Sequence, residues 1–236
     1  SYQVIDKSYT SSSHDGAVTK EQSTDVPVGE GFSHSLKSVV TTADTSIAAN
    51  QYHDVYQYRF EGNELTQLNY GTSGAKKSSL SFFVKSSVTG AYNGTLTNSN
   101  NTSKLPFTFT IAAANTWQRV KIENIPAITT SSDAGTAWVM SGNSYAGSIR
   151  IYGALGSDWV GATDKVWNTA NSNSAFGSAT NVNWLATVGN TFYLTGLQWE
   201  VNERCSDFEH RNLQDELVSC KRYYEEINPN KSTYYT

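Results

Sequence analysis

The sequence predicts an all-β fold, a two-sheet antiparallel β-sandwich with one α-helix near the C-terminal end. Three observations predict it: short stretches of alternating apolar and polar residues, turn residues between them, and one later stretch with helical spacing. Alternation, as opposed to continuous apolar runs, is typical of antiparallel sheets with one face toward water. The alternating stretches are 33–41, 53–60, 64–70, 79–85, 107–111, 117–125, 148–155 and 191–201.

Within each stretch, successive side chains are expected on opposite faces of the sheet. Leu80 and Phe82 are therefore expected on one face and Phe83 on the other. Trp117 begins its stretch and is expected in the core. In the last stretch, the same spacing places four residues on one face: Phe192, Leu194, Gly196 and, at the end, Gln198.

Turn residues separate the stretches, with one exception. Glu61-Gly62-Asn63 lies between two predicted strands and suits a tight hairpin. The exception is the segment 156–186, which is rich in Ser, Asn, Gly and Thr and carries three tryptophans. A connection of this length is usually either functional or packed by its own side chains.

The C-terminal helix is predicted from its start signals and its apolar stripe. Asn212 suits the N-cap, and Asp215 and Glu216 would lie in the first turn, where the helix dipole favours negative charge. The stripe that follows has helical spacing: Leu213, Leu217, Cys220, Tyr224 and Ile227.

No internal repeat and no second hydrophobic core is visible, so we expect one domain. Residues 1–30 would form an N-terminal arm or the first strands, and residues 31–204 the sandwich. Residues 205–236 would form the helix and a tail packed on the sandwich.

Composition narrows the classes of partner. Charged residues make up 16 % of the chain, below the typical proportion of about 25 %, and the net charge is −4 without any stripe of Lys and Arg. A nucleic-acid partner is therefore not expected. Membrane insertion is not expected either, because no apolar run approaches the length of a membrane span and no signal peptide is visible. Whether Cys205 and Cys220 are bridged is left open.

No catalytic motif is visible, and the chain is not expected to be an enzyme. The four histidines fit none of the metalloprotease, serine-hydrolase or Cys-His patterns, and His53 and His210 are expected to be structural. Asp158 and Asp164 could pair as in a glycosidase, but they lie in a polar loop segment and are expected to be solvated.

Four segments resemble a family of phage tail and virion proteins: 79–96, 112–126, 191–201 and 205–225. The similarity extends over residues 31–225. Its most specific part is the motif Phe208-Glu209-His210-Arg211, Glu216-Leu217 and Cys220-Lys221-Arg222-Tyr223-Tyr224. The family domain is a carbohydrate-binding-module-like jelly roll, so the resemblance implies two sheets in jelly-roll order.

The resemblance implies a non-enzymatic structural protein of the bacteriophage virion, assembled in the host cytoplasm. It would belong to a tail fibre, a tail tip or a capsid appendage, with other virion proteins as partners and host-surface glycans as ligands. A homotrimer would suit a fibre by analogy of class. Two alternatives stay open: a carbohydrate-binding module of a secreted glycan-active protein, and a capsid decoration protein without a ligand.

Aromatic residues in or near the polar loops are the candidate glycan contacts, because a sugar ring packs its apolar face on an aromatic ring. They are Trp138, Tyr145, Tyr152, Trp159, Trp167 and Trp184. Contact with another subunit and packing within the domain are equally open for the loop tryptophans. The candidate assembly residues are Trp199, Leu213, Leu217, Tyr223 and Tyr224. No cofactor is expected beyond a structural calcium, for which the weak candidate ligands are Asp44, Asp133 and Glu200.

Overall fold

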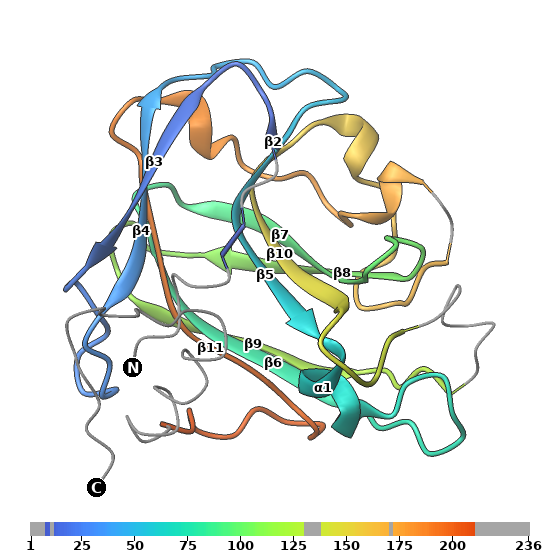
Figure 1. The fold of residues 1–236 in the computed structure, drawn as a ribbon. Coiled ribbons are helices and arrows are strands. Elements are labelled where there is room, and N and C mark those ends of the chain that lie inside the picture. Colours follow the sequence, from blue (N-terminus) through green and yellow to red (C-terminus); the bar gives the residue numbers. More distant parts are fainter. Residues whose placement is uncertain (1–7, 10–11, 130–137, 170–171, 211–236) are drawn as a thin grey trace, which may run out of the picture.

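The structure is a computed structural model that describes residues 8–9, 12–129, 138–169 and 172–210. Figure 1 shows two sheets stacked face to face, so the predicted β-sandwich is confirmed. The first sheet contains β1 (Ser8–Tyr9), β2 (Ser12–Ser13), β5 (Tyr52–Glu61), β7 (Gly90–Asn98), β8 (Lys104–Ile111) and β10 (Tyr145–Leu155). The second contains β3 (Ala17–Ser23), β4 (Ser35–Thr42), β6 (Ser78–Ser86), β9 (Gln118–Ile125) and β11 (Thr191–Glu200).

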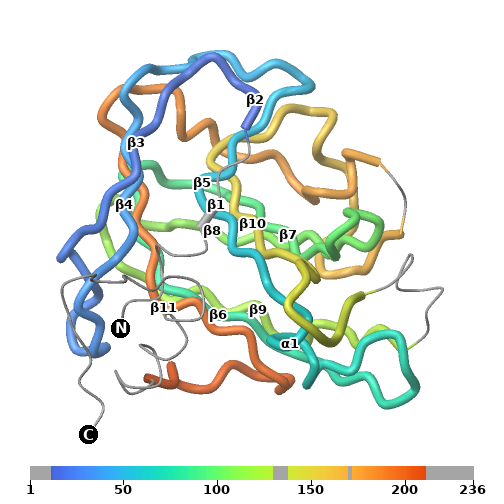
Figure 2. Tube along the Cα trace, viewed as in Figure 1, coloured from blue at the N-terminus to red at the C-terminus, as the bar shows by residue number. Residues whose placement is uncertain are grey.

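The strand order is that of a jelly roll. The first sheet runs β1-β5-β10-β7-β8, with β2 also paired to β5, and the second runs β3-β4-β11-β6-β9. Four nested antiparallel pairs build this order: β4 with β11, β5 with β10, β6 with β9, and β7 with β8. In Figure 2 the tube can be followed from β4 in one sheet to β5 in the other. The described part of 1–30 adds β1, β2 and β3 at the sheet edges, whereas the predicted C-terminal helix lies outside the described residues.

The core lies between the two sheets and follows the period-two pattern. Leu80 and Phe82 of β6 have no exposed surface and belong to this core, as predicted. Phe83 faces outward and contacts the ring of Phe32 on the outer side of the second sheet. Trp117 is half-buried outside the core, where its Nε1 donates to Asp25, so the prediction that it is a core residue is wrong.

The connection between β5 and β6 is helical, so the predictions of a tight hairpin at 61–63 and a strand at 64–70 are wrong. It forms α1 (Gly62–Leu65) and the 3-10 helix η1 (Thr66–Leu68). A capping box between Glu61 and Glu64 starts α1. Leu65 and Leu68, three residues apart, turn toward one side and pack with Trp138 in a second, smaller cluster. The three-residue spacing of these two leucines is typical of a helix and explains why the segment is helical rather than extended.

A β-bulge in β11 reverses the order of inner and outer residues along that strand. Thr195 pairs with Phe83 and Gln198 with Ser81, so two residues of β11 oppose one residue of β6. Gly196 lies at the bulge with φ +61°. Beyond it Trp199 packs against the core, so the prediction that Gly196 and Gln198 share a face with Phe192 and Leu194 is wrong.

Gly196→Ala is expected to lower the free energy of unfolding by about 2–3 kcal/mol. Part of this comes from the positive φ, and part from a Cβ that would lie 2.5 Å from the Phe32 ring. Gly189→Ala is the matched control, because Gly189 has φ +88° and nothing within 4 Å of an added Cβ. Urea unfolding should show a loss of only about 1 kcal/mol for the control. Equal losses for the two variants would contradict crowding at the bulge.

The long segment 156–186 packs in two places: Trp159 and Phe176 lie on the outer face of the first sheet, and Trp184 and Leu185 at its end belong to the main core. It contains the 3-10 helices η2 (Ser157–Trp159), η3 (Asn173–Ala175) and η4 (Trp184–Ala186). Phe176 and Trp159 pack with Tyr152 in a separate apolar cluster. The Asn93 side chain holds the segment down, because its Oδ1 accepts hydrogen bonds from Ser178 N and Ala179 N.

The segment covers a buried ion pair on the same face. Arg150 donates two hydrogen bonds to the Asp54 carboxylate, at 2.9 and 3.0 Å. The guanidinium also lies over the rings of Tyr152 and Phe176, at 5.3 and 4.9 Å from their centres. No helix within the described ranges is both long and apolar enough to cross a membrane.

Candidate functional site

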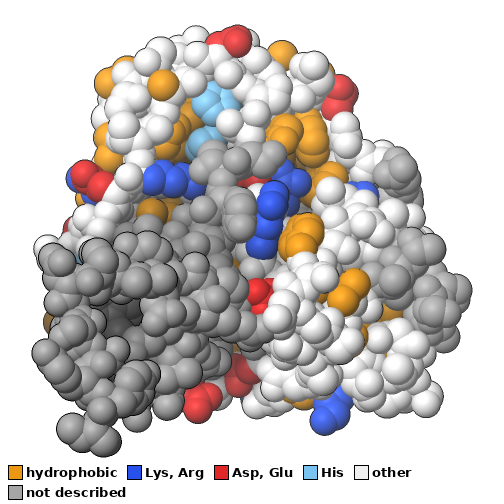
Figure 3. Space-filling view, viewed as in Figure 1, with side chains coloured by type: hydrophobic (Ala, Val, Ile, Leu, Met, Phe, Trp, Pro, Cys, Tyr) orange, Lys and Arg blue, Asp and Glu red, His pale blue; other side chains and the backbone are white. Residues whose placement is uncertain are grey.

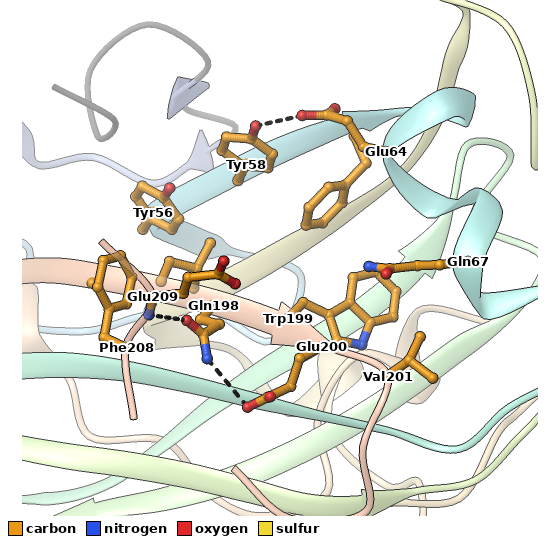
Figure 4. A pocket seen from close by; sticks show the side chains of 13 residues that line it. Tyr56, Tyr58, Glu64, Gln67, Gln198, Trp199, Glu200, Val201, Phe208 and Glu209 are labelled. Carbon is orange, nitrogen blue, oxygen red and sulfur yellow. Dashed lines mark hydrogen bonds between the residues drawn. The ribbon is translucent and has the colours of Figure 1, made fainter. Parts of the chain in front are cut away.

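A groove of about 400 Å³ opens at one edge of the sandwich, between the end of β5 and the second half of β11. It exists because the pairing of β4 with β11 covers only Thr191–Leu194 of β11. Figure 4 shows side chains from β5, α1, β11 and the segment after β11 converging on this space. We call it the edge groove.

Aromatic rings form two sides of the edge groove. Tyr58 and Phe60 come from β5, Trp199 from β11, and Phe208 from the segment that follows β11. All four are half-buried. Phe60 joins two of the others, because its ring centre lies 4.7 Å from that of Tyr58 and 5.2 Å from that of Trp199. Trp199 is fixed further by a hydrogen bond from its Nε1 to Ser78 Oγ, at 2.9 Å.

Two amide side chains contribute donors and acceptors. Gln198 has a fixed orientation, since its Oε1 accepts a hydrogen bond from Glu209 N at 2.8 Å and its Nε2 donates to Glu200 Oε1 at 3.2 Å (Figure 4). The Gln198 Nε2 also lies 3.1 Å from Ser206 Oγ. Gln67, just after α1, is exposed on the opposite side of the groove.

Three carboxylates complete the lining. Glu64 accepts a hydrogen bond from the Tyr58 hydroxyl at 2.9 Å, as Figure 4 shows. Glu200 accepts hydrogen bonds from Ser206 N at 2.8 Å and Ser206 Oγ at 2.7 Å. Glu209 is exposed, and no described residue bonds to its carboxylate. Rings with amides and carboxylates beside them can hold a polyhydroxylated ring on its apolar face while accepting its hydroxyl protons.

Four of the predicted glycan contacts lie in the interior. Trp184 and Tyr152 have no exposed surface, and Trp138 and Trp159 keep only 7 % and 9 % of theirs. Trp184 belongs to the main core, and Trp159 donates from Nε1 to Asn50 O at 3.0 Å. These rings offer no open face to a ligand. Packing within the domain accounts for their positions.

The other two predicted contacts remain partly exposed, but neither lines the edge groove. Tyr145 receives the guanidinium of Arg59 over its ring at 5.1 Å. Trp167 lines a shallow second cavity of about 360 Å³ with Lys165 and Val166, and its Nε1 donates to Pro126 O at 2.8 Å. No second aromatic ring joins Trp167 in the described lining of that cavity.

The predicted assembly and metal residues have separate outcomes. Trp199 lines the edge groove, whereas Leu213, Leu217, Tyr223 and Tyr224 lie outside the described residues, as does Asp133. Asp44 is buried, and its carboxylate accepts hydrogen bonds from Asp15 N and Ser46 N. Glu200 is bonded to Ser206. In the part of the chain that the structure describes, no three His, Cys, Asp or Glu side chains cluster as metal ligands would.

Two histidines form a pair near β2 and β5. His14 Nδ1 accepts a hydrogen bond from Gly16 N at 3.1 Å, so a neutral His14 carries its proton on Nε2 and donates it to His53 Nδ1 at 3.0 Å. His53 then carries its proton on Nε2, which is buried and has no hydrogen-bond partner among the described residues. The His53 ring stacks on Trp184. Figure 3 shows histidine side chains together in the upper half of this face.

His210, the other histidine expected to be structural, lies over the Phe32 ring and contacts Glu30 O at 2.8 Å. Cys205 carries a free thiol that lies 3.4 Å from Leu80 O, and burial raises its pKa. Asp164, one of the two loop acids, accepts hydrogen bonds from Thr108 Oγ1 and Ser178 Oγ, so it is bonded to the sheet rather than solvated.

The fold and the groove define the chain as a jelly-roll β-sandwich domain with an aromatic-lined groove at one edge. No family model and no curated protein sequence matches it. Among solved structures it is similar to the enzymatically active domain of tailspike protein 4 from bacteriophage CBA120, with 11 % identity and a TM-score of 0.46 over 85 % of this chain. That match covers only 20 % of the tailspike chain.

It is also similar to a family 11 carbohydrate-binding module from Clostridium thermocellum, solved with a β-1,3-1,4-mixed-linked tetrasaccharide. There the identity is 10 %, the TM-score 0.43, and the coverage 89 % of this chain and 94 % of the module. A CBM4 structure matches with 11 % identity and a TM-score of 0.39 over 85 % and 90 % of the two chains. At these identities and TM-scores, the similarities assign no ligand or activity to this chain.

Proposed function

We propose that this chain is a non-enzymatic glycan-binding domain of a bacteriophage particle, and that the edge groove is its binding site. The groove itself carries the proposal, because it places half-buried rings beside oriented amide and carboxylate groups. A pyranose could stack one face on Trp199, beside Phe60, while its hydroxyls reach Gln198. Flat surfaces on soluble domains lack this combination of shape and chemistry.

The assignment to a virion rests on the sequence resemblance; of its most specific motif, only Phe208, Glu209 and His210 fall in the described part. The proposed place is a tail fibre, tail tip or capsid appendage, with other virion proteins as partners and a homotrimer as the expected assembly in a fibre. A module of a secreted glycan-active protein would use the same groove. A decoration protein would leave it empty.

Binding to a glycan array, followed by titration calorimetry on the glycans that bind, tests the ligand. Trp199→Ala should weaken binding at least about tenfold, the equivalent of about 1.4 kcal/mol, because a stacking ring is lost. Gln67→Ala, at an exposed position with little packing, should weaken it a few-fold. Trp117→Ala removes a half-buried tryptophan outside the groove and should leave binding unchanged.

Thermal unfolding of each variant separates lost binding from lost folding. If the wild-type protein binds no glycan on the array, or if the Trp199 and Trp117 variants lose equal amounts of binding affinity, glycan binding in the groove is contradicted. Release of shorter sugars from a bound glycan would favour a hydrolase instead. Imaging of intact phage particles with an antibody to this chain tests the virion assignment separately.

A further inference from the structure

We propose that the edge groove selects glycans with free, protonated amino groups, such as chains of N-deacetylated hexosamine, and disfavours glycans with carboxylate, sulfate or phosphate groups. This inference rests on the proposed function and names its ligand class. It follows from the charges that line the groove. Glu64, Glu200 and Glu209 contribute carboxylates, and no Lys, Arg or His is among the described lining residues.

The position of each carboxylate supports this selection. Glu209 is exposed at the rim, with no described residue bonded to its carboxylate. Glu200 is held by neutral donors, Ser206 and Gln198, which leave its negative charge in place. Within the described residues, no ion pair joins Glu200 or Glu209 to a cation.

One described cation lies close to the groove, because Arg119 and Glu200 both bond to Ser206. Arg119 donates to Ser81 Oγ and to Ser206 O on the outer side of the second sheet, and it lies 3.5 Å from Asp207. It is not among the residues that line the groove. The negative charges therefore act on a ligand between partly apolar walls, where two charges interact more strongly than they do in open water.

The chemistry of the ligand follows. An ammonium group on a sugar can donate three hydrogen bonds, and carboxylates accept such charge-assisted bonds well. A carboxylated or sulfated sugar would bring like charges into the same space, which lowers its affinity. A neutral N-acetylated chain would keep the ring stacking on Trp199 and Phe60 but lose the ionic contribution.

The test uses one backbone in three charge states: a β-1,4-linked glucosamine oligomer, its N-acetylated form and its N-succinylated form. Calorimetry is done at about pH 6 and low salt with the full chain. The amine form should bind at least about tenfold more tightly than the acetylated form, and the succinylated form most weakly. Raising the salt from about 0.05 M to about 0.5 M should remove most of the difference.

Glu209→Gln should reduce the preference for the amine form over the acetylated form several-fold. Glu203→Gln is the matched control, since Glu203 is exposed, pairs with Lys77 at 3.1 Å and lies outside the groove lining. If the acetylated or succinylated form binds as tightly as the amine form or more tightly, the proposed selection is wrong. The proposed function still holds in that case, provided that Trp199→Ala abolishes the binding. Absence of binding by all three forms would overturn both.

Discussion

Replacing Asp54 with alanine is expected to lower the free energy of unfolding by about 3–5 kcal/mol, enough to unfold many domains of this size. Asp54 has no exposed surface, and Arg150 retains only 6 % of its own. Without the carboxylate, a guanidinium that cannot lose its proton would remain buried beneath the segment 156–186. The measurement is urea unfolding at neutral pH, followed by fluorescence.

Two comparisons isolate the cause. The double variant Asp54→Leu with Arg150→Met removes both charges and should recover most of the lost stability, because apolar side chains of similar size can replace a buried pair. Glu21→Ala breaks the surface pair with Lys37, which is bonded at 2.7 Å, and should change stability by less than about 1 kcal/mol. If the double variant is as unstable as Asp54→Ala, the loss comes from packing rather than from an unpaired charge.

Acidification from pH 8 to pH 4.5 is expected to lower the free energy of unfolding by roughly 2–3 kcal/mol through the protonation of His53 in the unfolded chain. Burial, and next the neighbouring His14 and Lys20, lowers the pKa of His53 to about 3. The unfolded chain takes up this proton near pH 6.5, whereas the folded chain does not until about pH 3. Between these values the unfolded state binds more protons, so stability falls as the pH falls below about 6.5.

The hydrogen bonds explain why the folded state resists protonation. A proton on His53 Nδ1 would oppose the Nε2 proton of His14, only 3.0 Å away. Burial lowers the pKa of His14 as well, although Asp44 and Asp15 act in the other direction. Asp54 has the opposite effect on stability, because burial raises its pKa to about 6 despite the attraction of Arg150. The contribution of Asp54 therefore makes the folded protein more stable as the pH falls below about 6.

The contribution of His53 is accordingly measured as a difference between variants. His53→Asn keeps an acceptor near the Nδ1 position without a titrating group, and its loss of stability between pH 8 and pH 4.5 should be roughly 2–3 kcal/mol smaller than that of the wild type. His34→Asn, at a histidine that contacts Ser33 on the surface, should retain the wild-type dependence. Identical pH profiles for wild type and His53→Asn would disprove the assignment.

Only one half of the candidate site could be predicted from the sequence. The aromatic residues Tyr58 and Phe60 alternate in the stretch 53–60, and that spacing indicates one wall of a surface or core. The opposite wall could not be found in this way. Uninterrupted alternation along β11 predicted Gln198 on the same face as the core residues and Trp199 on the other face, whereas the bulge reverses this order. The tryptophans of 156–186 were predicted to contact a ligand because of their polar neighbours, yet Trp159 packs within the segment's own cluster and Trp184 in the main core.

By itself, the sequence determined the class of fold, since period-two alternation can bury an apolar face only when two antiparallel sheets close over it. The low charge content and the lack of a basic stripe also predict that nucleic acid is not a partner, and this stays a prediction. Only the tertiary structure decided the site. The bulge at Gly196 turns Trp199 inward, and the early end of the β4 pairing opens the groove beside it. Both depend on contacts between strands distant in sequence, which no local pattern encodes.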